Sequence, residues 1–339
     1  MSQPQDLQEL LEEGSEINIV CHNNPDPDCL ASALALGRIA ATAGIDEQQI
    51  LYSGDISHQQ NRAFVNLLDV DLQPFDPETV QNRKPDSLLA LVDHSIPGEN
   101  NTVPPDADID IVIDHHPAED IDARFVDHRP DLGAAATILT EYVRTLDVDL
   151  ETDLATALLF AIRSDTLDFL RGATREDYDA AGHLHETADP DLIQQLSTPS
   201  VSGGTLDAIS TAIDNRRING AVLISHVGRT SERDALPQAV DYLVRLEGVQ
   251  TAIVFGLVNG SIQISARSPD ARVNVGRVLN EAFEDVGSGG GHQDVAGGEI
   301  PLGIFADYTS DDAQLLDMVE QIVTARLFAE LNLSEKNGE

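Results

Sequence analysis

The stretch "INIVCHNNPDPDCLASALAL", residues 17–36, passes from a short apolar run into a polar loop and then into a helical pattern. The apolar run stops just before His22, and Asp26 and Asp28 follow in the same loop. An apolar, β-branched run bounded by helices is typical of a strand buried on both faces of a parallel α/β sheet. Ligands of such sheets bind at the carboxyl ends of the strands, so this stretch predicts both the fold class and the position of the functional site.

Two more stretches of the first half follow the same plan. The segments "SLLALVDHS" at 87–95 and "DIDIVIDHH" at 108–116 each end an apolar run in a polar cluster, and helical patterns follow at about 134–146 and 151–164. Strands that alternate with helices predict βαβ units. We therefore expect an α/β fold whose N-terminal domain is a parallel sheet with helices on both faces.

The length of the chain favours two domains. From about 175 to 215 the pattern is helical and then polar, and "STPSVSGG" at 197–204 is its loosest part. We predict a catalytic domain at 1–190, a helical, flexible connector at 191–215, and a smaller α/β domain at 216–339.

The second domain should contain a hairpin. The alternating runs "TAIVFGLV" and "SIQISARS" are joined by Asn259-Gly260, a pair that favours a tight turn between antiparallel strands. The other expected elements are a strand at 220–227, helices near 235–247 and 273–285, a glycine loop "GSGGGHQDVAGG" at 287–298, and a terminal helix at about 310–331.

The composition is strongly acidic. The 339 residues include 59 Asp and Glu against 20 Lys and Arg, which gives a formal net charge of −39. The acids are spread through periodic apolar segments, so we interpret them as an adaptation to molar salt, which screens carboxylate repulsion within about 3 Å. We expect a halophilic, cytoplasmic protein. Duplex DNA is not expected as a partner, because Lys and Arg dominate contacts with phosphate.

A membrane is not expected as a partner either. The sequence has no run of about 20 apolar residues, and its acidic start differs from the basic and then apolar start of a signal peptide. Cys21 and Cys29 are the two cysteines, too few for a disulfide framework or a four-thiolate zinc site. We interpret them as small buried side chains.

Four segments carry chemically active side chains that follow apolar or helical runs. These side chains are His22, Asp26 and Asp28 in the first segment, Asp93 in the second, Asp114, His115 and His116 in the third, and Asp165 in the fourth. Simple alternatives exist: Asp28 could cap the following helix, Asp93 could open a turn, and His115 could be a core histidine. Taken together, these alternatives require four segments to place imidazoles and carboxylates at one sheet edge by coincidence.

Carboxylates and imidazoles without a thiolate suit hard or borderline divalent ions such as Mn²⁺, Mg²⁺ or Co²⁺ better than structural zinc. The set is large enough for two ions. Two ions about 3.5 to 4 Å apart can lower the pKa of a shared water and stabilise the attacking and leaving oxygens of a phosphoryl displacement. A carboxylate that bridges them must lie between the two ligand sets, and Asp93 on a central strand is the candidate.

In this order and spacing, the motifs "HNNPDPD", "VDHS", "DHH" and "SDT" resemble the four motifs of the DHH phosphoesterase superfamily. The segment "SARSPDARVNVGRV" and the glycine loop after it resemble the DHH-associated C-terminal domain of the nanoRNase and RecJ-like branches. These motifs span residues 22–298. Ala31 is a departure, since relatives often carry glycine there, and it should affect helix packing more than metal binding.

The resemblance implies a role for each motif residue. One Mn²⁺ would be held by His22, Asp26 and Asp93, and a second by Asp28, Asp93, His115 and Asp165. His116 corresponds to a residue that faces the substrate phosphate, and Asp114 to one that orients the neighbouring imidazoles. His94 matches no ligand position, and we interpret it as a structural histidine.

In the second domain the resemblance implies a substrate-binding surface. Its residues would be Arg267, Ser268, Gly289, Gly290, Gly291 and His292. The glycines can present successive backbone N–H groups to an anion, and Arg267 and His292 supply donors and positive charge. The alternative is an ordinary glycine turn beside a surface arginine. The active site would lie between the two domains, where ligand pockets often occur.

We expect an Mn²⁺-dependent phosphodiesterase that hydrolyses short single-stranded oligonucleotides or dinucleotides to nucleoside monophosphates by two-metal hydroxide attack. Alternatives are a 3′-phosphoadenosine 5′-phosphate phosphatase, a linear or cyclic di-AMP phosphodiesterase, and a RecJ-like single-strand exonuclease. Inorganic pyrophosphatase is a more distant alternative, and the glycine-rich loop, which would bind a nucleotide, speaks against it. A noncatalytic nucleotide sensor would be expected to lack ligands, and none is missing here. The sequence leaves open substrate length, RNA or DNA preference, cleavage polarity and homodimer formation.

Overall fold

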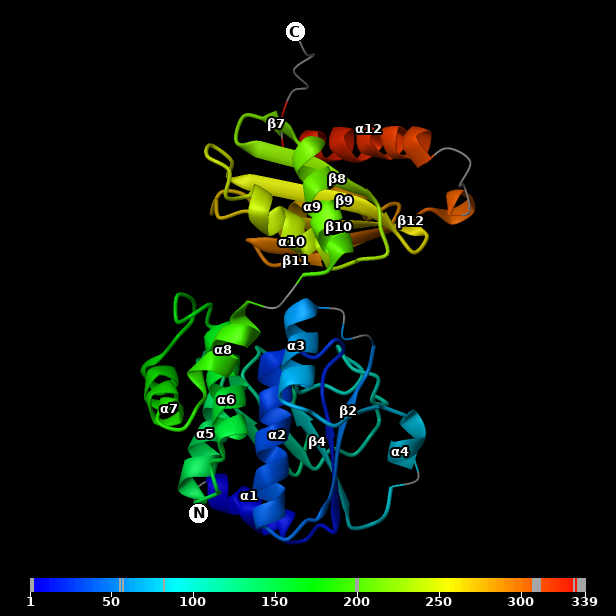
Figure 1. Cartoon of the computed structure of the whole chain (residues 1–339). Helices are drawn as coiled ribbons and strands as arrows, with labels where there is room; N and C mark the ends of the chain where they lie inside the picture. Colours follow the sequence, from blue (N-terminus) through cyan, green and yellow to red (C-terminus); the bar gives the residue numbers. More distant parts are fainter. Residues whose placement is uncertain are drawn as a thin grey trace. The chain divides into compact units, whose positions relative to one another are not determined.

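The computed structural model divides into two compact units, residues 1–199 and 200–339, which are described one by one (Figure 1). The structure describes residues 3–54, 56, 58–81, 83–198, 201–306, 312–331 and 333. The segment 191–215, predicted as a connector, contains most of α8 (Pro190–Ser197) and all of α9 (Gly203–Asp214). The apolar face of α8 is buried in the core of the first unit, and that of α9 in a core of the second.

The first unit is built on a six-stranded parallel sheet in the order β3-β2-β1-β4-β5-β6. Its strands are β1 (Glu16–Val20), β2 (Glu47–Tyr52), β3 (Leu72–Pro74), β4 (Ser87–Val92), β5 (Ile111–Asp114) and β6 (Phe125–His128). The central strands β1, β4 and β5 are the three apolar runs of the sequence, and every residue of β4 is buried. The predicted parallel α/β sheet is confirmed.

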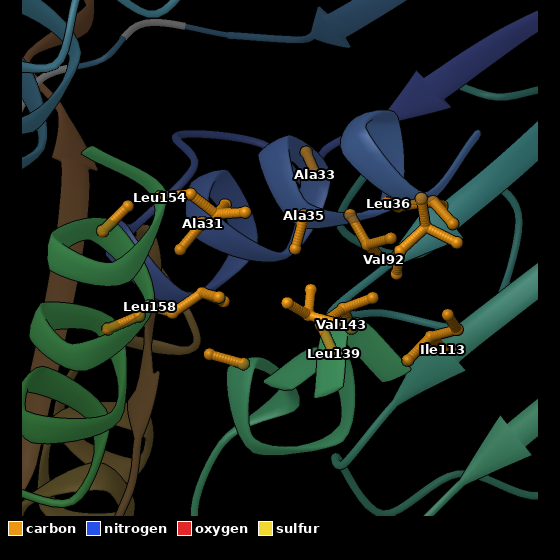
Figure 2. Close-up of a cluster of buried hydrophobic side chains, with 14 of the residues drawn as sticks. Ala31, Ala33, Ala35, Leu36, Val92, Ile113, Leu139, Val143, Leu154 and Leu158 are labelled. Atoms are coloured by element: carbon orange, nitrogen blue, oxygen red, sulfur yellow. The ribbon is translucent and has the colours of Figure 1, made fainter. Parts of the chain in front are cut away.

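Most helices of this unit cover one face of the sheet. They are α1 (Gln3–Leu11), α2 (Pro27–Thr42), α3 (Gln59–Leu67), α5 (Ala135–Thr145), α6 (Thr152–Asp165), α7 (Arg175–His185) and α8. Figure 2 shows the small side chains Ala31 and Ala35 of α2 in one buried cluster with Leu139 of α5 and Leu158 of α6. Because alanine is small, α2 can pack closely against both α5 and α6. This packing lets the start of α2 reach the start of α5.

Among the described residues, one short helix and several loops cover the other face of the sheet. The helix is α4 (Pro77–Gln81), and a second cluster of buried side chains includes Leu89 and Leu91 of β4 with Val103 and Ile109 of the following loop. The prediction of helices on both faces is confirmed. The two faces are covered unequally, because the connections after β4 and β5 are loops.

The second unit contains a six-stranded mixed sheet in the order β11-β12-β10-β9-β8-β7. Its strands are β7 (Arg217–Asn219), β8 (Val222–Arg229), β9 (Thr251–Val258), β10 (Ser261–Arg267), β11 (Ser288–Gly291) and β12 (Val295–Pro301), of which β8 and β9 are the parallel pair. Strands β9 and β10 form the predicted hairpin. Asn259 and Gly260 have φ angles of 49° and 83°, as a two-residue turn of this hand requires.

Helices cover both faces of the second sheet. They are α9 and α10 (Ala235–Leu243) on one face, and α11 (Val275–Phe283) and α12 (Asp312–Glu330) on the other, with a short 3-10 turn, η1 (Gly303–Phe305), before α12. The first residues of the predicted helix at 310–331, 310 and 311, lie outside the described residues. Within the described ranges, no helix is both long and apolar enough to cross a membrane.

The prediction of a glycine loop at 287–298 is wrong, because most of these residues form strands β11 and β12. A Cβ atom on Gly289 would lie 2.6 Å from the carbonyl oxygen of Leu279 in α11, so glycine lets the helix pack directly on the strand. Gly291 has a φ of +140°, which side chains disfavour. Close packing at Gly289 and the backbone conformation of Gly291 therefore explain two of the three successive glycines.

Candidate metal centre

The carboxyl ends of β1, β4 and β5, which are neighbours in the sheet, bring the predicted residues together. The loop after β1 carries His22, Asp26 and Asp28, Asp93 follows β4, Asp114 ends β5 with His115 and His116 after it, and Asp165 ends α6. Within each of three groups of side chains, the donor atoms lie within 4.8 Å of one another: His22, Cys29 and Asp93; Asp93, His115 and His116; and Asp28, His115 and Asp165. The arrangement is therefore one cluster at the sheet edge.

Asp93 lies at the centre of this cluster and is buried. Its Oδ2 atom is 3.5 Å from Nε2 of His22, and its Oδ1 atom is 3.3 Å from Nε2 of His115. The backbone of Asp93 has a φ of 63°, which is uncommon outside glycine, and its N–H donates to the carbonyl oxygen of Ile113. The strained turn at the strand end aims one carboxylate between two histidines.

His22 and Asp26 lie on one side of Asp93. Nε2 of His22 is 3.8 Å from Oδ1 of Asp26, and Nδ1 of His22 donates to the carbonyl oxygen of Asn23 at 3.0 Å. The same Oδ1 of Asp26 accepts the N–H groups of Asp28 and Cys29, so Asp26 is the N-cap of α2. The helix start thereby fixes the carboxylate.

Asp28, His115 and Asp165 lie on the other side. Nε2 of His115 is 3.3 Å from Oδ2 of Asp165 and 3.7 Å from Oδ2 of Asp28. The two oxygens of Asp28 accept the N–H groups of Ala135 and Ala136 at 2.7 and 2.8 Å. Asp28 therefore binds the start of α5. The alternative that Asp28 caps the helix that follows it is wrong, because the N-cap of that helix, α2, is Asp26.

Asp114 holds His116. The Oδ1 atom of Asp114 accepts the backbone N–H and the Nδ1–H of His116, each at 3.0 Å, and its Oδ2 atom accepts the hydroxyl of Ser95 at 2.7 Å. Asp114 is completely buried, whereas just over half of the His116 side chain is exposed. The ring therefore has one nitrogen fixed in the protein and the other directed away from Asp114.

The charges of the cluster are unbalanced without a cation. Burial lowers the pKa of both His22 and His115, but the neighbouring carboxylates outweigh burial and raise these pKa values to about 11 and about 12. Burial and the negative charges of Asp93 and Asp165 raise the pKa of Asp28. The cluster thus attracts positive charge strongly, whether as protons or as metal ions.

Two buried polar atoms that lack a hydrogen-bond partner within the described ranges indicate whether a metal ion fits the cluster. Oδ1 of Asp93 and Nε2 of His115 are buried and have no hydrogen-bond partner among the described residues. A carboxylate oxygen and an imidazole nitrogen are both ligands of divalent transition metals, and leaving them buried and unpaired is unfavourable. The residues present therefore fit a divalent cation at this place.

A hollow of about 320 Å³ opens beside the cluster and is lined by His22, Asp26, Asp93, His94 and His116 among others. His94 donates from Nδ1 to the carbonyl oxygen of Val92 at 2.9 Å, and burial lowers its pKa to about 4, so the ring is neutral. Its Nε2 atom lacks a hydrogen-bond partner in the described part of the chain. His94 thus faces the site, a placement that its sequence context did not reveal.

The predicted substrate-binding residues of the second unit are only partly together. Gly289 and Gly290 line a hollow of about 440 Å³ with Arg233 and Ser265. The residues that do not line it are Arg267, Ser268, Gly291 and His292. Arg267 donates to Asp241 at 2.8 Å, and Ser268 is buried with its hydroxyl near Thr251. The charge of Arg267 is therefore already paired within the unit.

The residues that lead into α5, 132–136, support the site, but this role was not predicted from the sequence. The carbonyl oxygen of Leu132 accepts Nδ1 of His115 at 3.1 Å, and the next residues supply the N–H groups that bind Asp28. These contacts use backbone atoms, which leave no residue-type signal.

Known families match both units. Residues 16–162 match the DHH family, N-terminal domain, and residues 219–325 match the DHHA1 domain. An uncharacterised protein of Methanocaldococcus jannaschii is 38% identical over 326 residues, which cover 96% of this chain and 66% of that protein. In the solved structures, an exopolyphosphatase-related protein from Bacteroides fragilis has the same fold, with a TM-score of 0.73, 16% identity and 97% of each chain covered.

Two further relatives have named activities. The cyclic-di-AMP phosphodiesterase PdeA of Listeria monocytogenes is 27% identical over 310 residues, covering 85% of this chain and 45% of PdeA. A probable manganese-dependent inorganic pyrophosphatase of Staphylococcus epidermidis is 30% identical over 174 residues, covering 50% of this chain and 55% of that protein. The chain spans between about half and two thirds of these curated relatives' lengths.

Proposed function

This chain belongs to the DHH superfamily, and from that premise we propose that it is a metal-dependent phosphodiesterase that hydrolyses short single-stranded oligonucleotides or dinucleotides to nucleoside monophosphates. One observation carries the proposal. The two oxygens of Asp93 face different histidines, His22 at 3.5 Å and His115 at 3.3 Å. A carboxylate placed in this way can bridge two divalent ions.

The proposed ligands fall into two sets that share Asp93. His22 and Asp26 complete the first set, and Asp28, His115 and Asp165 complete the second. Oxygen and imidazole donors favour Mn²⁺, with Mg²⁺ or Co²⁺ as substitutes. The name of the manganese-dependent pyrophosphatase relative, which matches half of the chain, supports Mn²⁺ as the first choice.

Bound ions would supply a nucleophilic oxygen at neutral pH and neutralise charge on the phosphate. The chain itself contributes His116, whose Nδ1–H is fixed by Asp114 and whose pKa is raised by that carboxylate. Nε2–H of His116 would donate to an oxygen of the reacting phosphate, and the buried Asp114 would hold the ring in that orientation. The hollow beside the cluster would admit the phosphate and its sugar.

Charge and size support a short substrate. A chain with 20 Lys and Arg against 59 Asp and Glu offers few cations to the phosphates of a long polyanion, and salt further weakens such contacts. The hollow lined by Gly289 and Gly290 in the second unit would hold the end of a short substrate. Gly290 has no atom within 4 Å of the place where a Cβ would stand, so its backbone is open to a ligand.

A dinucleotide phosphodiesterase is favoured over a pyrophosphatase by the extent of the matches. The match to PdeA covers 85% of the chain, whereas the match to the pyrophosphatase covers 50%. The test is a substrate panel with Mn²⁺ in molar KCl, containing a 5′-labelled dinucleotide, a long oligomer, cyclic di-AMP, 3′-phosphoadenosine 5′-phosphate and pyrophosphate. We expect the fastest turnover on the dinucleotide. Cleavage of pyrophosphate alone, or of none of these compounds, would overturn the proposal.

A further inference from the structure

Asp177 is a completely buried carboxylate outside the candidate metal centre. It is the third residue of α7, where its Oδ2 atom accepts the N–H and the hydroxyl of the N-cap residue Thr174 at 2.7 and 2.8 Å. A capping box of this kind needs only an acidic side chain at the helix surface. Complete burial of the carboxylate therefore requires a further explanation.

The same carboxylate also binds the start of a second helix. Its Oδ2 atom accepts the N–H of Gly133 at 3.0 Å, and its Oδ1 atom accepts the hydroxyl of Thr137 at 2.5 Å. Gly133 and Thr137 both lie in residues 132–137, which we call the α5 entry segment. Asp177 thus joins the start of α7 to the start of α5.

The α5 entry segment in turn binds two side chains of the candidate metal centre. The carbonyl oxygen of Leu132 accepts Nδ1 of His115, which directs Nε2 of the ring at Asp93. The N–H groups of Ala135 and Ala136 donate to Asp28. Both side chains belong to the second of the two proposed ligand sets.

Asp165, the third side chain of that set, directly precedes Thr166, which lies against the same segment. A Cβ atom on Gly133 would lie 2.6 Å from Cγ2 of Thr166 and 2.8 Å from Oδ2 of Asp177. Thr166 directly follows Asp165, and its hydroxyl donates to the carbonyl oxygen of Ile162. Glycine at 133 therefore lets the entry segment, Asp177 and the end of α6 meet at one point.

The first ligand set is held differently. His22 donates to the carbonyl oxygen of Asn23, and Asp26 accepts from the start of α2. These contacts lie within residues 22–29, away from the α5 entry segment in sequence. A change at Asp177 should therefore affect the two sets unequally.

We infer that Asp177 is a positioning residue for the second metal site: through the α5 entry segment it sets the geometry of Asp28, His115 and Asp165. This inference rests on the proposed two-metal function. Partners of metal ligands typically contribute 10- to 100-fold to metal affinity. Asp177 acts one step further from the metal, through hydrogen bonds of the backbone.

Mn²⁺ titration of the full chain in molar KCl, followed by calorimetry and by electron paramagnetic resonance, tests the inference without a substrate. The parent should bind two ions with a spin-coupled signal. In Asp177→Ala the affinity for one ion should fall by about 10-fold or more, the other should bind as in the parent, and the coupled signal should be lost. Asp177→Asn should rescue binding, because its amide oxygen can accept from Gly133 and Thr174 while its NH₂ group donates to Thr137.

Thr174→Ala is the matched control. It removes the α7 cap but keeps the bonds of Asp177 to Gly133 and Thr137, so it should lower the melting temperature and leave both ions bound. If Asp177→Ala does not fold, Thr137→Val removes a single hydrogen bond to the same carboxylate and should weaken the same ion selectively. The inference would be overturned if Asp177→Ala and Thr137→Val bound both ions as tightly as the parent, or if they weakened the binding of both ions equally. A parent that does not bind two ions would instead contradict the proposed function.

Discussion

Nε2 of His115 lies 3.3 Å from Oδ1 of Asp93, and both atoms are buried without a hydrogen-bond partner in the part of the chain that the structure describes. Nδ1 of His115 donates to a carbonyl oxygen, so in the neutral ring Nε2 carries a lone pair. Two buried lone pairs that face each other repel. The pair is therefore stable only with a cation between or on these atoms.

Metal-free protein should lose stability as the pH rises. The pKa values of His22 and His115 are raised to about 11 and about 12 in the folded state, against about 6.5 in an unfolded chain. Below pH 6.5 both states hold the protons and the stabilisation is complete. Between pH 6.5 and 11 only the folded state holds them, so the free energy of unfolding should fall by up to about 1.4 kcal/mol per pH unit for each histidine.

This pH dependence is measured by thermal unfolding in EDTA and constant molar KCl at pH 7 and pH 9.5. His22→Gln should show a smaller decrease than the parent, since one of the two protons is removed. A melting temperature that stays constant or rises between these pH values would contradict the charge balance inferred for the site.

Asp26→Asn and Asp28→Asn should each remove a different ion. Asparagine is as good an N-cap as aspartate, so Asp26→Asn should keep the stability of α2. Asp28→Asn would direct an NH₂ group at the N–H of Ala135 or Ala136 and should cost about 1 to 3 kcal/mol of stability. Mn²⁺ titration should find one ion in each single variant and none in the double variant. A double variant that still binds one ion would contradict the split.

His116→Gln should separate catalysis from metal binding. More than half of this side chain is exposed beside the hollow, and no proposed ligand set includes it. We expect kcat on the dinucleotide to fall by about 10²- to 10⁴-fold, the range typical of an acid-base group, while two Mn²⁺ ions remain bound. Unchanged kcat would remove His116 from the reaction.

Stability should rise with salt up to molar concentrations. The chain carries 59 acidic against 20 basic side chains, and the repulsion among them is screened within about 3 Å only near 1 M salt. The melting temperature should therefore increase between about 0.1 M and about 2 M KCl. A melting temperature that is highest in dilute buffer would contradict the interpretation of the acidic composition as an adaptation to salt.

The sequence predicted the central strands because their apolar runs end abruptly in polar residues. Strands β2 and β3 were not predicted, since "EQQILY" is largely polar and "LQP" is only three residues long. Strand β6 was also missed, because only Phe125 and Val126 of its four residues are apolar, although Phe125 and Asp127 are the buried ones. Short strands near a sheet edge leave little apolar periodicity to detect.

The side chains of the candidate site were predictable, but their supports were not. His22, Asp93 and His115 follow strand ends, and parallel strands bring such ends together. In contrast, Asp28 binds backbone N–H groups 107 and 108 residues later in the chain, at alanines that carry no chemical signal. The buried Asp177 gave no signal beyond that of a helix start, and the glycines of β11 predicted a loop because packing and turns use the same residue.

The most direct test of the central claim is the number and coupling of Mn²⁺ ions in the parent and in Asp93→Asn. Asparagine tolerates the left-handed backbone of residue 93 and has the same shape as aspartate, so the variant should fold. We predict two ions per chain with an exchange-coupled electron paramagnetic resonance signal in the parent, and loss of the coupling with weaker binding of both ions in the variant. Two coupled ions in Asp93→Asn, or a single ion in the parent, would contradict a dinuclear centre bridged by Asp93.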